Sequence, residues 1–371
     1  MRVSSARMRG PAARIMLPLP AIDGRRRFSM LEDAPAWVVE APLYAYALWL
    51  AVKHGGIALP AIANPSILIG GLAGESKTDL FSLVGPAARK HFAPFVTIRA
   101  TDSVADIETA RAEAGLTYPL VAKPDVGLNG RGVKIVRSVD DLARHLSGFP
   151  SGASVLLQRY VSEEGEAGVF YVRKPSEPTG HITSLTLKYF PKVVGDGQRT
   201  LGDLIRAHPH TAKRAHIYLR RNKQHVDEVV PAGEEHRVVS VGNHVRGAVF
   251  ADGAEHITKE MVEVFDELAK DIKGFYFGRF DVRFADLEAL KRGKENFTII
   301  EYNGASSEPT HVRDPRTSAL KVWRDFMEHW RYAYEIGAEQ KARGVAPVPL
   351  REIWRILRTE TRLVTQYPDE E

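Results

Sequence analysis

The stretch "FGRFDVRFADLEALKRGKENFTIIEYNG", residues 277–304, carries the clearest fold pattern in this sequence. Two apolar, strand-like runs form its ends, and a polar linker joins them. Alternate side chains of a strand point to opposite faces, so Arg279 and Asp281 share one face of the first run. By the same rule, Glu301 and Asn303 share one face of the second run. The pattern therefore places charged and amide side chains inside two otherwise apolar strands.

A polar linker between two strands favours an antiparallel pair. In the right register, this pair brings together the carboxylates of Asp281 and Glu301 and the amide of Asn303. Hard oxygen ligands of this kind suit Mg²⁺, which proteins hold with few side chains and with substrate phosphates. Strict alternation also places Phe297 and Ile299 on the face of Glu301 and Asn303. The alternative is a two-stranded ribbon whose polar face is only solvated.

The composition is that of an ordinary globular protein. The chain has 371 residues, of which 44% are hydrophobic and 26% charged, enough for a sizeable core and two or three lobes. The absence of cysteine excludes disulfides, zinc–thiolate sites and a cysteine nucleophile, and it is consistent with the cytoplasmic location that we expect. The net charge of +5 suits an anionic small molecule and is too small to indicate nucleic acid.

The first part of the chain differs from the rest. Residues 1–27 contain seven arginines and one acid, which predicts a flexible basic tail over residues 1–30 without the pattern of a secretory signal. Residues 31–73 are predicted to form a short, mostly helical region. Its uncharged run "APLYAYALWLAV" (41–52) is too short to span a bilayer and predicts a buried helix. The alternative is interfacial contact of residues 1–53 with a membrane.

Strands and helices interleave along the remaining chain without a strict strand–helix–strand rhythm, which favours an α+β fold with largely antiparallel sheets. Amphipathic helices are predicted over residues 258–273 and 317–342, and a last helix over residues 349–364.

Two glycine-containing stretches are candidates for phosphate contact. "GGLAGESKT" (70–78) nearly forms a P-loop, but Ser76 stands where that motif needs a glycine before Lys77. "AKPDVGLNGRGVKIV" (122–136) places Lys123 at a strand end, before three glycines whose backbone N–H groups could approach a phosphate: Gly127, Gly130 and Gly132. The alternatives are an exposed lysine at a helix start and a plain hairpin loop.

Two further features concern cations. Lys188 is the only charged residue of the apolar strand "SLTLKYF" (184–190), and a buried strand lysine needs an anion, whereas an edge strand would leave it exposed. Residues 206–225 contain six Lys or Arg and no acid. We predict that this segment contacts an anionic substrate and not nucleic acid, with a solvated helix face as the alternative.

Together these motifs resemble those of the ATP-grasp ligases, and within that superfamily most closely those of the D-alanine–D-alanine ligase group. The resemblance covers roughly residues 74–312. It implies an ATP-grasp fold, in which two α/β lobes with largely antiparallel sheets clasp ATP. The implied domain spans residues 74–330, with a lid lobe at about 85–160, and a C-terminal helical extension spans residues 331–371.

The resemblance also implies roles for single residues. Lys77 and Lys123 would contact the ATP phosphates under the glycine loop, and Lys188 would reach the γ-phosphate. "LLQRYV" (156–161) resembles the adenine hinge, with Gln158 where the family usually has an acid. The remaining implied roles are purine contact through the backbone of Arg159 and Val161, ribose binding by Glu166, binding of Mg²⁺ (or Mn²⁺) by Asp281, Glu301 and Asn303, and stabilisation of the oxyanion of a tetrahedral intermediate by Arg279.

These implications describe an ATP- and Mg²⁺-dependent carboxylate–amine ligase that acts through an acyl phosphate on small molecules such as amino acids or peptides. "VVGDGQRTLGDLI" (193–205) resembles instead the cyanophycin-synthetase type, and "GASSEPTHVRDP" (304–315) replaces the usual substrate loop, so the substrates stay open. The alternatives are an ATP-grasp kinase and a non-catalytic nucleotide- or polyanion-binding protein. The oligomeric state is also open, with a dimer as one expectation.

Overall fold

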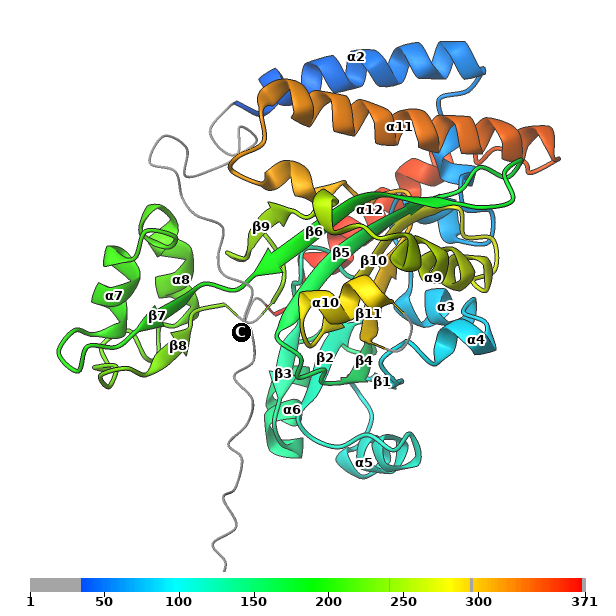
Figure 1. Ribbon diagram of the computed structural model, residues 1–371. Helices are drawn as coiled ribbons and strands as arrows, with labels where there is room; N and C mark the ends of the chain where they lie inside the picture. The colour runs from blue at the N-terminus through cyan, green and yellow to red at the C-terminus, as the bar shows by residue number, and fades with distance from the viewer. Residues whose placement is uncertain (1–34, 240, 294–295, 369–371) are drawn as a thin grey trace, which may run out of the picture.

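The computed structural model describes residues 35–239, 241–293 and 296–368, so the predicted basic tail of residues 1–30 lies outside the described residues. Two antiparallel sheets, each with its own hydrophobic core, form the body of the molecule, and a small two-stranded unit projects from it (Figure 1). All pairs of named strands in the described chain are antiparallel. The predicted α+β class with largely antiparallel sheets is therefore confirmed.

A helical layer lies at one edge of the molecule. The 19-residue helix α2 (Ala36–His54) packs against the longest helix, α11 (Ala319–Ala342), and ends at Gly55, which adopts a left-handed conformation with φ 74°. Glycine takes this conformation without steric cost, which stops the helix. Short elements follow and lead to the first sheet: η1 (Leu59–Ile62), η2 (Leu68–Gly71), α3 (Lys77–Ser82) and α4 (Pro86–Arg89).

The first sheet has the strand order β1-β4-β2-β3 and lies within residues 95–159. Its strands are β1 (Phe95–Arg99), β2 (Leu120–Pro124), β3 (Lys134–Val136) and β4 (Ser154–Arg159), and its helices are α5 (Val104–Glu113) and α6 (Val139–Leu146). Ser103 and Ser138 cap these two helices by accepting a hydrogen bond from a backbone N–H of the first turn. The sheet buries an apolar core against both helices.

The second sheet has the order β11-β10-β5-β6-β9 and contains the largest core of the molecule. Its strands are β5 (Gly165–Val172), β6 (His181–Tyr189), β9 (Val249–Asp252), β10 (Phe277–Phe284) and β11 (Phe297–Asn303); the helices α9 (Lys259–Lys270) and α10 (Leu287–Arg292) and the turn η4 (Ala254–His256) belong to the same lobe. Phe280, Val282 and Phe284 of β10 point into this core, so the predicted alternation of β10 is confirmed.

The predicted alternation of β11 is wrong because the strand contains a β-bulge. Asp281 pairs with Glu301 and Val282 pairs with Ile299, which leaves Ile300 as an extra residue. An extra residue reverses the facing of all later side chains. Phe297 and Ile299 therefore face the core, whereas Glu301 and Asn303 face the other side of the sheet.

A small unit is inserted between β6 and β9. It consists of β7 (Lys192–Val194), α7 (Leu201–Ala207), η3 (Ala212–Arg214), α8 (Ala215–Arg221) and β8 (Glu235–Arg237). It has its own apolar core, built around Leu201, Ile205 and Tyr218. Figure 1 shows this unit, in green, set apart from the two sheets. We call residues 190–248 the inserted unit.

The C-terminal part ties the other parts together. After η5 (Thr310–Arg313) and α11, the helix α12 (Leu350–Val364) runs from the N-terminal elements to the first sheet. Ile356 packs against Ile69 near the start of the described chain, whereas Tyr367 is buried in the core of the first sheet. Within the described ranges, no helix combines the length and the apolar character that crossing a membrane requires.

Candidate active site

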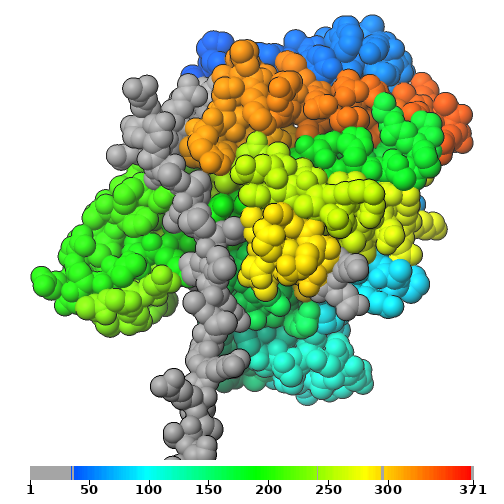
Figure 2. Space-filling model, viewed as in Figure 1, coloured from blue at the N-terminus to red at the C-terminus, as the bar shows by residue number. Residues whose placement is uncertain are grey.

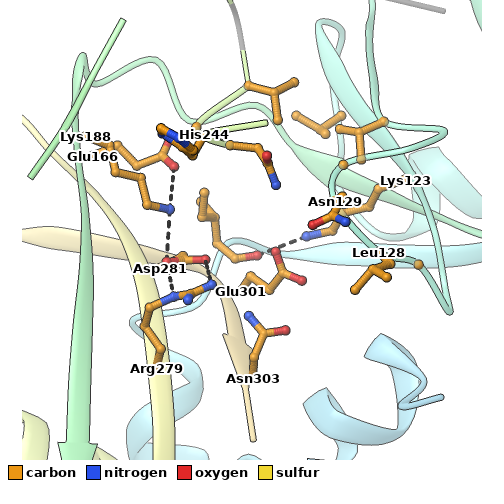
Figure 3. A pocket seen from close by; sticks show the side chains of 18 of the residues that line it. Lys123, Leu128, Asn129, Glu166, Lys188, His244, Arg279, Asp281, Glu301 and Asn303 are labelled. Carbon is orange, nitrogen blue, oxygen red and sulfur yellow. Dashed lines mark hydrogen bonds and ion pairs between the residues drawn. The ribbon is translucent and has the colours of Figure 1, made fainter. Parts of the chain in front are cut away.

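A cavity of about 600 Å³ lies between the two sheets, and the inserted unit closes one side of it. Residues from distant parts of the sequence meet there (Figure 3). Thirteen of the fourteen predicted site residues line it: Lys77, Lys123, Gly127, Gly130, Gln158, Arg159, Val161, Glu166, Lys188, Arg279, Asp281, Glu301 and Asn303. The exception is Gly132, which lies against Phe149, and whose N–H donates to the Pro368 carbonyl.

Asp281 lies at the centre of a network of charges. Its Oδ1 atom is 3.0 Å from Nζ of Lys188 and 3.0 Å from Nε of Arg279. Figure 3 shows the carboxylate between these two cations. Burial raises the pKa of Asp281, but Arg279 and Lys188 outweigh burial and lower it to about 2. Asp281 is therefore an anion at neutral pH, although only 6% of it is exposed.

Lys188 is buried and paired, so the exposed edge-strand alternative does not hold. Besides Asp281, its Nζ atom lies 3.0 Å from Oε1 of Glu166. Burial lowers the pKa of Lys188, but the two acids outweigh burial and raise it. The other carboxylate oxygen of Glu166 lies 2.8 Å from Arg283, whose position follows from the alternation that groups Arg279 with Asp281. Both oxygens of the predicted ribose-binding acid thus face cations.

Lys77 and Lys123 approach the same cavity from two other elements: α3, which packs on the core of the second sheet, and β2 of the first sheet. Lys77 begins α3, and its Nζ atom is 3.8 Å from Glu301 Oε1. Lys123, at the end of β2, donates to the carbonyl of Ile300 over 3.0 Å. The bulge leaves this carbonyl outside the regular ladder, so it is free to accept. Burial lowers the pKa of Lys123 to about 8.

The glycine loop, residues 125–132, lies between two other segments. Asn129 and Gly130 have φ values of 54° and 69°, a conformation that glycine and asparagine tolerate best. On one side, Arg246 of the inserted unit donates to the Asn129 carbonyl over 2.8 Å. On the other side, Arg131 donates to the carbonyls of Thr365 and Tyr367 over 3.2 and 3.0 Å. Contacts from two directions therefore position the loop.

In the predicted adenine hinge (156–161), some of the hydrogen-bonding groups already have partners within the protein. Gln158 is buried, and its amide donates to the Ala93 carbonyl over 3.2 Å. The N–H of Arg159 donates to the Pro94 carbonyl over 2.9 Å, so a purine could not use it. The Arg159 carbonyl, with Val161 in the following loop, is the part of the hinge that could still meet a base.

The oxygen ligands predicted for Mg²⁺ come together without forming a complete metal site. Asp281 pairs with Glu301 and Arg279 with Asn303 across β10 and β11. Among the described residues, no three His, Cys, Asp or Glu side chains gather as a metal-binding group. Because Mg²⁺ is usually held by one or two carboxylates and completed by phosphates and water, two carboxylates and an amide fit an ion that arrives with ATP.

One titratable group beside the site, Glu75, is not among the residues predicted from the sequence. Glu75 lies just before Lys77, and its Oε2 atom is buried without a hydrogen-bond partner among the described residues. Burial raises the pKa of Glu75 to about 8, and Glu301 adds to this effect while Lys77 opposes it. The spacing of Glu75 and Lys77 in "GESK" is the only signal that the sequence offered.

The basic segment is not part of the cavity. None of residues 206–225 lines it. Arg214 reaches the lining residue His244 by donating to its carbonyl over 3.3 Å. The predicted contact between this segment and an anionic substrate thus finds no support in the geometry.

No protein-family model matches the chain, and no curated protein matches it in a sequence comparison. Solved structures similar to it include a bifunctional glutathione synthetase from Pasteurella multocida (16% identity, TM-score 0.36), the VanG D-Ala:D-Ser ligase from Enterococcus faecalis (14%, 0.41) and the D-cycloserine synthetase DcsG (14%, 0.37). The alignments cover 68%, 71% and 70% of this chain.

The same alignments cover 35%, 64% and 70% of those three chains, so the chain spans about a third of the first and less than two thirds of the second. Similarity at this level assigns neither a reaction nor a substrate. The fold is described from the chain itself: two antiparallel sheets, with lysines from both directed at one cavity, agree with the two-lobed arrangement that the sequence motifs led us to expect.

Proposed function

We propose that the protein is an ATP- and Mg²⁺-dependent carboxylate–amine ligase. The observation that supports this most is convergence: Lys77, Lys123 and Lys188 come from three elements and meet Asp281 and Glu301 at one cavity. A binding module has no need of this combination of cations and oxygen ligands. Because the chain lacks cysteine, we also propose that it works in the cytoplasm.

In the proposed reaction, a carboxylate oxygen of one substrate attacks the γ-phosphorus of ATP. The new P–O bond gives an acyl phosphate, and the bond to the oxygen that bridges the β- and γ-phosphorus atoms breaks, which releases ADP. An amine then attacks the acyl carbon, phosphate leaves and the amine nitrogen loses a proton. The protein contributes alignment and charge, since phosphoryl transfer needs little covalent help.

The charged residues of the cavity divide this work. Lys123 and Lys188 would neutralise the phosphates, and both lie in buried positions where a charge acts strongly. Arg279 would stabilise the oxyanion of the tetrahedral intermediate, and its guanidinium is already held by Asp281. Asp281, Glu301 and Asn303 would hold Mg²⁺, which supplies positive charge to the phosphates when bound.

A substrate screen tests this proposal. Amino acids and dipeptides are offered with ATP and Mg²⁺, and ADP and free phosphate are measured together. A ligase releases both in equal amounts and only when carboxylate and amine are present. ADP without free phosphate, together with a stable phosphorylated product, would indicate a kinase instead. Release of neither with any substrate pair would contradict both enzymatic assignments.

The substitution Asp281→Asn sharpens the test. It keeps the shape of the side chain and removes one negative charge beside Lys188 and Arg279, so the fold should persist. Turnover should fall by at least about a hundredfold, because the metal that Asp281 holds stabilises the developing phosphoryl charge. Asp252→Asn, on the edge strand β9 and away from the cavity lining, is the control and should keep its activity. Full activity of Asp281→Asn would refute the metal assignment.

A further inference from the structure

Helix α2 presents apolar residues on two opposite faces. One face carries Val39, Leu43 and Leu50, which are buried against α11 and its neighbours. The opposite face carries a stripe of large apolar side chains that are exposed: Trp37, Tyr44, Leu48 and Val52, with Trp49 beside them. Figures 1 and 2 show α2, in blue, alongside α11 at the outer edge of the molecule.

The spacing of these residues makes the stripe continuous. Positions 37, 44, 48 and 52 differ by seven, four and four, which places them on one line along a helix. Trp37 is 71% and Val52 78% exposed, so the stripe is not covered by the described part of the chain. A helix that is apolar all round is normally buried. A contiguous exposed patch of this kind marks an interaction surface.

The charges around the stripe indicate what covers it. Residues 41–52 contain no charged side chain, whereas Lys53 follows directly and lies over the Trp49 ring at 4.8 Å. Residues 1–40 contain seven arginines and four acids, of which Glu32, Asp33 and Glu40 lie nearest to Trp37 in the sequence, and the last three arginines end ten residues before Trp37, so this part of the chain has a net charge of +3. Ten residues span at most about 35 Å, so these arginines stay close to the stripe.

We propose that this face of α2 lies on a lipid surface with anionic headgroups. Trp and Tyr are favoured at the boundary between headgroups and acyl chains, and arginines next to an apolar helix face are attracted to anionic lipids. Because α11 covers the opposite face, α2 can meet a bilayer only side-on. Pairing of two copies through the same stripe would instead bring two arginine-rich segments together, and like charges repel.

Vesicle flotation of the full chain tests the proposal. The vesicles contain phosphatidylcholine alone or with three tenths phosphatidylglycerol. The wild type should bind the anionic vesicles at least about tenfold more strongly than the neutral ones. The double substitution Leu48→Gln and Val52→Gln should reduce this partitioning at least about tenfold, since two exposed side chains lose their apolar contact. Leu350→Gln, on α12, is the matched control, because Leu350 and Leu48 are 58% and 60% exposed.

Three results would overturn the proposal. One is equal binding to neutral and anionic vesicles, or binding to neither. Another is an equal loss of binding in Leu350→Gln. The third is a dimer in sedimentation equilibrium that the double substitution dissociates, with no vesicle binding by the wild type, which would assign the stripe to a second copy. Circular dichroism and ATP binding verify that the double variant is folded.

Discussion

At the scale of single residues, two groups with unusual pKa values lie close to the proposed phosphate site. Burial lowers the pKa of Lys123 to about 8 and raises that of Glu75 to about 8. Both shifts have the same cause, since burial disfavours the charged form of a group. For Lys123 the charged form is the protonated one, and for Glu75 it is the deprotonated one. The two groups therefore change charge in the same pH range, and both changes make the site less positive as the pH rises.

For Lys123 the sign of the pH dependence is fixed. Its pKa is about 8 in the folded protein and 10.5 when unperturbed, so between these values the unfolded chain binds more protons. The contribution of Lys123 to the free energy of unfolding therefore rises from about pH 8 to 10.5 and is constant below pH 8. ATP affinity should have the opposite pH dependence and decrease as the pH rises, because in the proposed site the ATP phosphates are bound by the protonated, positively charged form of Lys123.

We predict that ATP affinity falls above about pH 8, approaching tenfold per pH unit as Lys123 loses its proton. Isothermal titration calorimetry of ATP binding between pH 7 and 9.5 measures this. Lys123→Arg keeps its charge over the whole range and should remove most of this decrease, leaving only the part due to Glu75. Glu75→Gln should retain it. If Glu75→Gln removes the decrease and Lys123→Arg retains it, Glu75 is the group that titrates.

The sequence could predict charged residues of the site where they follow a simple period. Alternation in β10 placed Arg279 and Asp281 together, and the structure confirms that face. It could not predict that Glu75 is buried, because this depends on a close approach of Gly71 and Gly304, which are distant in sequence. Nor could the sequence show that the backbone N–H of the predicted hinge residue Arg159 donates a hydrogen bond to the Pro94 carbonyl.

At the scale of elements, capping residues and hydrophobic periodicity predicted the helices correctly, whereas the β-bulge in β11 could not be predicted from the sequence. The helices predicted over residues 258–273 and 349–364 are Lys259–Lys270 and Leu350–Val364. In β11 the extra residue Ile300 has no marker in the sequence, since the preceding residue, Ile299, is identical to it. The position of the bulge is set by the pairing of β11 with β10. Only the assembled sheet shows how the bulge turns Glu301 toward the cavity.

We predict that the contact of Arg131 with the C-terminal residues helps to hold the glycine loop closed. Arg131→Gln removes the guanidinium that donates to the carbonyls of Thr365 and Tyr367. The loop should then open more often, because the hydrogen bonds that tie it to residues 365–368 are reduced to the one from the Gly132 N–H to the Pro368 carbonyl. We expect faster hydrogen exchange over residues 127–132 and a severalfold higher KM for ATP, with kcat changed less.

Arg144→Gln is the matched control, since this arginine is exposed on α6 and its Nη2 atom lies 3.7 Å from Asp141. It should leave the exchange and the KM unchanged. Mg²⁺-ATP should slow exchange in the wild-type loop, because its amides gain an anion. Unchanged exchange in Arg131→Gln, with and without nucleotide, would contradict a role of the C-terminal residues in holding the loop.

At the scale of the whole molecule, the cavity depends on parts with separate cores. The first sheet, the second sheet and the inserted unit each bury their own apolar cluster, and each contributes residues that line the cavity. The sequence resemblance implied the two sheets because its motifs lie on them. It could not place the inserted unit or α12, whose positions follow from contacts such as Arg246 with Asn129 and Tyr367 with Phe149.

This assembly predicts how nucleotide affects unfolding. A ligand that binds only the folded state, at a hundred times its Kd, raises the free energy of unfolding by about 2.7 kcal/mol. Mg²⁺-ATP contacts both sheets in the proposed site, so it should raise the temperature at which each core unfolds and bring separate calorimetric transitions closer together.

ATP with a chelator should have a smaller effect, and Asp281→Asn should remove the part that depends on Mg²⁺. Arg220→Gln, at an exposed position of the basic segment, should respond like the wild type, because none of residues 206–225 lines the cavity. A stabilisation by Mg²⁺-ATP that Asp281→Asn retains and Arg220→Gln loses would move the nucleotide site away from the cavity and onto the inserted unit.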